Sequence, residues 1–387
     1  KPIEDANANQ WMTLDHILTY TLASGDTTYI DNGNCRRSLD QAVFYCNNRG
    51  ALPAFGDTGV PTKGYPTNFL IKAGHVLRDG RSEFLLRKRF DRPLDYFQTR
   101  SGARYDPGET GSDPFLIRSF EKYFCDGLEP ETPEEMLGVQ ALEVAGGFYD
   151  FAENPTARPR EVRPLNLPRE EAFDTVCFRE GFGPEDQYLM LHGIFYGNHS
   201  HEDGNTISEF SANDRIFLVD ASYTEGPTLK HHNGVTAVRD GEAWEAPALC
   251  RLEGVADLEC VGMSRTSVEG EWGALWTRSI VWRKGRCFVV VDEVEATQAG
   301  EFALQCHWRT MGTPALKDGT LEVVQRDPGS GREDRFVLQS VGGGRVSLER
   351  DWENFGHWWE AYPYADDYVN ILSPESFGRR LINTAKQ

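Results

Sequence analysis

Histidines and carboxylates gather in one central stretch of the sequence. His199 and His201 are separated by one residue, so on an extended segment both imidazoles point to the same side. Asp220 follows an apolar run farther along, and His231 and His232 follow Asp220 in the next polar segment. Imidazole and carboxylate groups are the ligands that zinc takes at neutral pH, and three of them leave a position open for chemistry. The spacing therefore predicts a zinc site here.

The elements that must position these groups differ between the two parts of the chain. Apolar residues at helical spacing predict helices in the first third, over 12–24, 38–50 (with Ser38 as N-cap), 67–80, 82–90 and 114–127. From about residue 138, short apolar or alternating segments between Gly, Asp and Pro turns predict strands, beginning with 139–154. The segment 282–287, WRKGRC, predicts a tight hairpin, and His192 in its apolar segment is expected to be a packed core histidine.

This order predicts an α+β protein of two domains, a helical domain over residues 1–135 and a large antiparallel β-sandwich over residues 136–387. No apolar run approaches the roughly 20 residues that a membrane span needs. The net charge of −20 argues against a nucleic-acid partner, which would select a basic surface. An acidic substrate would need a local cluster of cations or a metal.

The eight cysteines include no C-x-x-C pair, which excludes a zinc ribbon and a thioredoxin-type redox motif. Several cysteines lie in apolar runs, such as Cys287 in RCFVVV, and are expected to be buried free thiols.

The stretch 189–238, from LMLHG to GVTAV, resembles the heparinase II/III-like polysaccharide lyases. That family carries an H-x-H-x-D segment, then a strand that ends in Asp, then His-Asn before a further strand. EDANANQW (4–11) and LPAFGD (52–57) are similar to the helical part of the family. The resemblance implies an α/α toroid followed by a β-sandwich. Five or six helices would form only a partial toroid, so we expect that an N-terminal portion is missing.

The resemblance also implies roles for single residues. His201, Asp220 and His232 would be the ligands of a Zn²⁺ ion, with His231 as the alternative to His232. His199 would face the substrate, and Asp203 would orient an imidazole.

The activity that the resemblance implies is β-elimination on an acidic, uronic-acid-containing polysaccharide or oligosaccharide. Such a reaction needs a group that neutralises the uronate carboxylate and groups that move protons at C5 and at the leaving oxygen. Asn9 or Gln10 stands where the family has its neutraliser, although Gln10 would be unusual in that role. Tyr65 stands where the family has its acid–base tyrosine, with Tyr196 and Tyr105 as alternatives. The resemblance further implies a periplasmic or secreted protein whose signal peptide lies outside this chain.

Two other functions stay open. A non-catalytic, metal-containing glycan-binding protein would keep the sheet domain and lack the catalytic tyrosine. A zinc metallohydrolase is suggested by HSHED at 199–203, which resembles the H-x-H-x-D-H of metallo-β-lactamases. However, Gly204 stands at the sixth position, and the alternating αβ pattern of that fold is absent.

Overall fold

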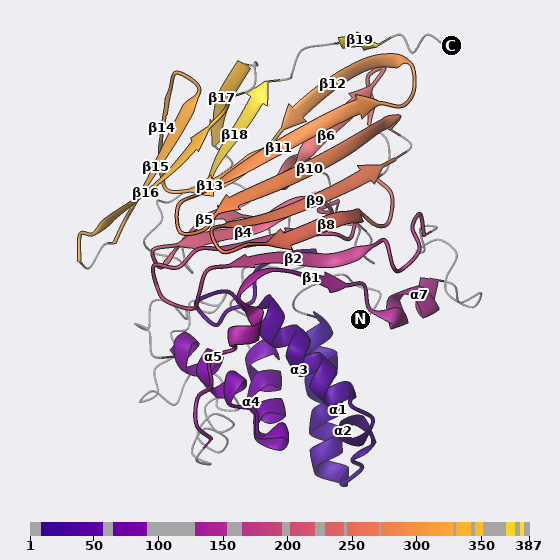
Figure 1. The fold of residues 1–387 in the computed structure, drawn as a ribbon, viewed down its shortest axis with the longest axis vertical. Coiled ribbons are helices and arrows are strands. Elements are labelled where there is room, and N and C mark those ends of the chain that lie inside the picture. The colour runs from indigo at the N-terminus through magenta and orange to yellow at the C-terminus, as the bar shows by residue number, and fades with distance from the viewer. Residues whose placement is uncertain are drawn as a thin grey trace.

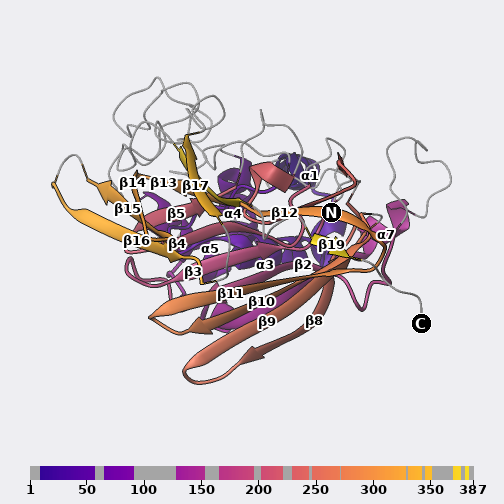
Figure 2. The same ribbon diagram turned by 90° about the horizontal axis from the view of Figure 1, so that it is seen from above.

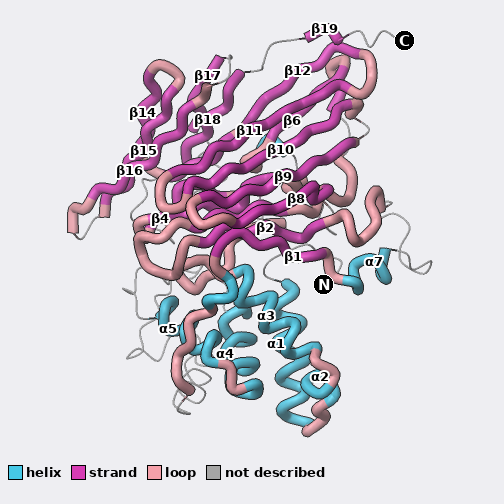
Figure 3. Tube along the Cα trace, viewed as in Figure 1, coloured by secondary structure: helices cyan, strands magenta, loops and turns pink. Residues whose placement is uncertain are grey.

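A computed structural model gives the fold as helices followed by strands (Figure 1, Figure 3). It describes residues 9–56, 65–90, 128–152, 165–195, 202–220, 229–243, 246–270, 272–327, 330–341, 345–350, 369–375 and 380–382. Among these residues, no helix is both long and apolar enough to cross a membrane.

The helical part consists of five helices in the described residues before the first strand: α1 (Asn9–Ser24), α2 (Thr28–Asp31), α3 (Asn34–Tyr45), α4 (Tyr65–Leu77) and α5 (Gly80–Phe90). Four of the predicted helices are thus confirmed, and the fifth, over 114–127, lies outside the described residues. The predicted bounds of α3 are wrong. It begins before Ser38, after Gly33 in left-handed conformation (φ 79°), and ends at Tyr45. The side chain of Asn47 then accepts hydrogen bonds from the backbone N–H groups of Arg49 and Ala51, a local pattern that competes with helix.

The strands follow in chain order, with short helical turns among them: η2 (Glu134–Met136), β1 (Gly138–Glu143), α7 (Gly146–Ala152), β2 (Phe173–Arg179), β3 (Tyr188–His192), β4 (Thr206–Ala212), β5 (Arg215–Val219), η3 (Leu229–His231), β6 (Val235–Arg239), β7 (Glu242–Ala243), β8 (Arg251–Asp257), β9 (Val261–Glu269), β10 (Ala274–Arg283), β11 (Cys287–Ala296), β12 (Gly300–Cys306), β13 (Trp308–Met311), β14 (Thr313–Lys317), β15 (Thr320–Arg326), β16 (Glu333–Gln339), β17 (Arg345–Arg350), β18 (Val369–Glu375) and β19 (Arg380–Ile382).

Antiparallel pairing joins these strands into several sheets. An eight-stranded sheet has the order β1-β2-β3-β4-β5-β13-β18-β17, and a four-stranded sheet has the order β11-β10-β9-β8. A second four-stranded sheet has the order β19-β12-β6-β7, and a three-stranded sheet has the order β14-β15-β16. The predicted hairpin at 282–287 is confirmed, because β10 and β11 pair from Arg283 opposite Cys287 onward.

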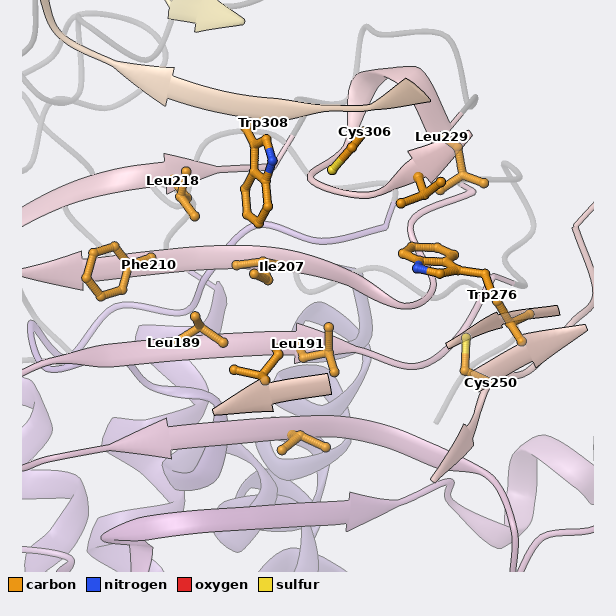
Figure 4. Packing of buried hydrophobic residues seen from close by; sticks show 14 of the residues in the cluster. Leu189, Leu191, Ile207, Phe210, Leu218, Leu229, Cys250, Trp276, Cys306 and Trp308 are labelled. Atoms are coloured by element: carbon orange, nitrogen blue, oxygen red, sulfur yellow. The ribbon is translucent and has the colours of Figure 1, made fainter. Parts of the chain in front are cut away.

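The eight-stranded sheet packs on the β8–β11 sheet through a large apolar core (Figure 4). Leu189, Leu191 and Ile207 of the first sheet share this core with Trp276 of β10. Figure 2 shows the two sheets as adjacent layers. This face-to-face packing is the sandwich that the sequence predicts.

The helices pack on the other face of the same eight-stranded sheet. Tyr188 and Met190 belong to a second buried cluster with residues of α1, α3 and α4, whereas Leu189 and Leu191 belong to the core between the sheets. This alternation follows from the two-residue repeat of a strand. β3 is therefore buried along its whole length.

Four expectations need correction or stay open. Within 139–154, residues 146–152 form the helix α7 where the sequence predicts strand. Cys287 is exposed, because β11 alternates between exposed and half-buried residues. The described helices do not confirm a toroid, and the domain boundary at 135/136 stays a prediction.

Candidate metal centre

Asp203, Asp220 and His232 lie close together because of how β4, β5 and β6 are connected. Asp203 precedes β4 and Asp220 directly follows β5. These strands form an antiparallel hairpin, so the start of β4 and the end of β5 lie at the same edge. An isolated bridge between Ile207 of β4 and Asn233 brings the segment that carries His232 to this edge as well.

One ligand atom from each of these three residues lies within 4.8 Å of the others. Nδ1 of His232 lies 2.5 Å from Oδ1 of Asp220. Asp203 and Asp220 are each 1% exposed, and His232 is fully buried. Two carboxylates buried together are costly unless positive charge compensates them. Two carboxylates and an imidazole are also ligand types that Zn²⁺ accepts, so the residues present fit such an ion.

Asp203 contacts the helical part of the chain as well as this cluster. Its Oδ2 accepts a hydrogen bond of 2.6 Å from the backbone N–H of Gly56 and lies 3.4 Å from Nδ1 of His192. Its Oδ1 is buried and has no hydrogen-bond partner among the residues that the structure describes. The ring of His192 packs on Phe55, with 4.6 Å between centroids, so this buried histidine joins two parts of the fold.

A buried asparagine, Asn233, holds the strands that carry the cluster. Its Nδ2 donates to the carbonyl oxygens of Ile207 (2.7 Å) and Val219 (2.8 Å), and its Oδ1 accepts from the backbone N–H of Arg309 (2.6 Å). Val219 precedes Asp220 and Asn233 follows His232. One side chain therefore fixes the backbone beside two of the three clustered residues.

A buried arginine, Arg278, joins the backbone that follows Asp203 to the backbone that follows His232. One terminal nitrogen of its guanidinium donates to the carbonyl oxygens of Asn205 (2.9 Å) and Asn233 (2.8 Å). Its Nε and its other terminal nitrogen donate to the carboxylate of Asp292, at 2.8 and 3.0 Å. Sequence reasoning missed Arg278. The only available signal was a charged residue inside an apolar strand, which by itself names no partner.

The chain after Asp203 turns where only a small residue fits. A Cβ atom at Gly204 would lie 2.3 Å from Cδ2 of Phe195, closer than such atoms approach. The next residue, Asn205, has a left-handed backbone (φ 59°), and its N–H donates to the carbonyl oxygen of His192 at 2.7 Å. Gly204, which counted against a metallo-β-lactamase motif, thus has a packing role here.

Several residues predicted for the site cannot be compared with the structure. His199 and His201, and the alternatives Tyr196 and Tyr105, lie outside the described residues. The assignment of His201 as a zinc ligand and of His199 as a substrate-facing group therefore stays a prediction. His231 is half-buried and is not part of the cluster.

On the helical side, the predicted neutraliser and tyrosine stand at the first turns of neighbouring helices. Trp11 of α1 packs on Phe69 of α4, with 5.5 Å between ring centroids. Gln10 is 1% exposed, and within the described part of the chain its Nε2 has no hydrogen-bond partner. Tyr65 is the first residue of α4, and Asn9 is the first residue of α1. The side chains of Tyr65 and Asn9 lie outside the described part of the structure.

Polar side chains join the helices to the sheet beside this site. We call Tyr45, Asn47, Asp174, Arg179 and Glu209 the helix–sheet seam. Tyr45 donates through its hydroxyl to Asp174 (2.5 Å), and Asn47 donates through Nδ2 to both oxygens of Glu209 (2.9 and 3.2 Å). One nitrogen of Arg179 donates to the carbonyl oxygens of Phe44 (3.2 Å) and Cys46 (2.5 Å), just where α3 ends.

Burial raises the pKa of Glu209 to about 7. Hydrogen bonds from Asn47 and Ser211, and the charges of Arg49 and Arg179, act in the opposite direction without offsetting the burial.

Comparison with known proteins gives a likeness of fold. No protein-family model matches the sequence, and no curated protein matches it. The crystal structure of the heparan sulfate lyase HepC from Pedobacter heparinus aligns with a TM-score of 0.53 and 13% identity, covering 87% of this chain and 44% of HepC. Heparinase III, the BT4657 gene product, aligns with a TM-score of 0.50 and 14% identity, covering 95% of this chain and 57% of that protein. The chain thus spans about half the length of these two structures and shares the fold of heparan sulfate lyases at low sequence identity.

Proposed function

We propose that the protein is a polysaccharide lyase that cleaves an acidic, uronic-acid-containing glycan by β-elimination. The observation that carries the proposal is the buried group of Asp203, Asp220 and His232 in a fold shared with lyases. Asp203 follows the H-x-H segment by two residues in the sequence. Fold alone does not establish an activity, so the residues of the site have to support it.

The roles on the helical side follow from the chemistry of the reaction. The proton on C5 of a uronate is weakly acidic, and it becomes removable only when the neighbouring carboxylate is neutralised. Gln10 has a buried amide nitrogen with no hydrogen-bond partner in the described ranges, which supports its role, or that of neighbouring Asn9, as the neutraliser. Tyr65 would move the proton, and His199 would contact the sugar near the reacting atoms.

The sheet side would hold a zinc ion through His201, Asp220 and His232, with Asp203 beside them. When bound, the ion would supply fixed positive charge in a protein whose net charge is −20. Positive charge near a phenol favours its ionised form and so lowers its pKa from about 10. Asn233 and Arg278 would hold the backbone beside Asp220 and His232 in place.

The proposed substrate is an acidic polysaccharide or oligosaccharide, and the proposed location is the periplasm or the cell exterior, where such polymers occur. A glycan-binding protein without activity and a zinc hydrolase remain the alternatives. The lyase and the hydrolase differ in the product that they release, and the glycan-binding protein releases none.

The direct test is to incubate the purified protein with heparan sulfate, chondroitin sulfate, alginate and ulvan. A lyase leaves an unsaturated uronate, so ultraviolet absorbance should rise with at least one of them. Sugar release without this absorbance would indicate a hydrolase, and binding without any release would indicate a glycan-binding protein.

Two variants assign the residues. Tyr65→Phe removes one oxygen and should lower kcat by several orders of magnitude, whereas His199→Ala should keep the zinc and lower kcat by about 10²-fold or more. Both should melt at nearly the temperature of the parent. A Tyr65→Phe variant with parental kcat would transfer the role to another tyrosine, of which Tyr196 is the first candidate.

A further inference from the structure

Asp203 occupies a position that an orienting group for one imidazole does not require. Its carboxylate is 1% exposed and lies between two parts of the fold that are far apart in the sequence. Oδ2 accepts the N–H of Gly56, which is 147 residues away, and one of its oxygens lies within 4.8 Å of ligand atoms of both Asp220 and His232.

We propose that Asp203 is a positioning residue that couples the metal centre to the segment 51–56. In this role, Oδ1, which is buried and has no hydrogen-bond partner among the described residues, would face the cation, while Oδ2 accepts the N–H of Gly56. The inference rests on the proposed metal centre and deepens it, because it assigns the ion an effect on the helical side of the site.

The segment 51–56 packs against the helices, so a shift of the backbone at Gly56 would alter that packing. Phe55 packs edge-on against Tyr45, with 5.4 Å between centroids, and Tyr45 packs edge-on against Trp11 at 6.4 Å. Trp11 is next to Gln10 on α1, and Gly56 precedes Tyr65 by nine residues in the sequence. Gln10 is therefore linked by packing through Trp11, and Tyr65 by a stretch of nine residues in the sequence, to a segment that Asp203 holds at Gly56.

Electrostatics gives the coupling its direction. Without a cation, the carboxylates of Asp203 and Asp220 repel each other in a buried place, which favours their separation. A bound cation removes the repulsion and holds the Asp203 carboxylate where it accepts the Gly56 N–H. Metal binding should therefore stabilise the segment 51–56, and coupling of this kind is reciprocal.

The test is hydrogen exchange of the full-length protein, measured by mass spectrometry with zinc and after chelation. Peptides that cover residues 51–56 and 229–235 report on the two sides of Asp203. In the parent, zinc should slow exchange in both peptides, by about 5- to 150-fold, which is the usual range of such coupling. The number of zinc ions bound is measured on the same samples.

Asp203→Asn is the decisive variant, because the amide oxygen can still accept the Gly56 N–H while the anionic oxygen is lost. Zinc should bind about 10- to 100-fold more weakly. At saturating zinc, peptide 229–235 should still be protected, whereas peptide 51–56 should no longer respond. The matched control is Asp174→Asn, which alters another buried carboxylate between helices and sheet and should leave both responses as in the parent.

The possible outcomes separate the two proposals. If the parent takes up no zinc, the metal centre and the coupling are both wrong. If the parent binds zinc but exchange in peptide 51–56 does not change, the metal centre stands and the coupling is wrong. The coupling is also overturned if Asp203→Asn retains the parental response of peptide 51–56.

Discussion

His231 and His232 are adjacent in the sequence but lie in different surroundings. His232 is fully buried with Nδ1 2.5 Å from Oδ1 of Asp220, whereas His231 is half-buried and outside the cluster. We therefore expect His232→Ala to lose bound zinc and His231→Ala to keep it. His232→Ala should also lower the free energy of unfolding by about 3–5 kcal/mol, the usual cost of leaving a buried charge without its partner.

Metal analysis and denaturant unfolding of the two alanine variants check this assignment. Equal zinc content in both variants, or zinc loss in His231→Ala alone, would mean that the cluster seen around Asp220 is not the metal centre. In that case the buried pair of His232 and Asp220 would have only a structural role.

Glu209 makes stability depend on pH in an unusual direction. Burial raises its pKa to about 7 in the folded protein, above its ordinary value of 4.5. Between these two values the folded state binds more protons than the unfolded state, so this group's contribution to stability falls as pH rises and is constant above about pH 7. Glu209→Gln, which keeps an acceptor for Asn47 and does not ionise, should remove that part of the pH dependence.

Thermal unfolding of the parent and of Glu209→Gln between pH 5 and pH 8.5 tests this point. The variant should be more stable than the parent above pH 7, by a few degrees, and the difference should shrink toward pH 5. Other groups titrate equally in both proteins, so parallel curves would show that Glu209 ionises normally.

At the scale of single residues, the sequence could predict ligand types but not all of the contacts. Asp220 is a candidate because a carboxylate follows a strand, and His231 and His232 are candidates because they lie in the next segment. The choice of His232 between them came from the family resemblance. The contact of Asp203 with Gly56 could not be predicted, because it joins residues 147 positions apart through a backbone N–H, which every residue except proline carries.

Among the elements, the β10–β11 hairpin supports the candidate metal centre through Arg278. This guanidinium is fully buried, pairs with Asp292 and donates to the backbone of Asn205 and Asn233. Arg278→Lys keeps the charge but loses the planar fork that makes four hydrogen bonds at once. We expect weaker zinc binding by about 10- to 100-fold, as for other groups that support metal ligands.

Arg265→Lys on the neighbouring strand β9 is the control for Arg278→Lys. Arg265 is about half exposed and pairs with Glu253 and Glu293, and such surface pairs contribute only about 0–1 kcal/mol. Zinc titration and denaturant unfolding should show a loss for Arg278→Lys and almost none for Arg265→Lys. Equal behaviour would mean that the hairpin does not support the centre.

The elements themselves were predictable where the apolar pattern was long. α1, α4 and the β10–β11 hairpin are examples, because each presents a clear repeat of helix or strand. The segment 146–152 was not, since a short apolar run after two glycines fits helix and strand equally well. The early end of α3 depends on hydrogen bonds of the Asn47 side chain, which periodicity does not reveal.

For the molecule as a whole, the order of helices and strands and the sandwich followed from the sequence, but the way in which the helices meet the sheet did not. The helix–sheet seam consists of polar residues such as Asn47, Arg179 and Glu209, which a pattern of apolar residues places at the surface. They are buried because they pair with one another and with backbone carbonyls across the two parts. Such pairing is visible only in three dimensions.

The apolar cluster shared by the helices and the strands β2 and β3 limits how far the helices can move away from the sheet. A hinge motion that swings the helices away from the sheet would expose Tyr188 and Met190 together with Trp11 and Tyr45, and would break the bonds of Arg179 to the end of α3. Exposing apolar surface to water costs about 25 cal/mol of free energy per Å², so such a wide opening would be rare. The two parts should move as one body.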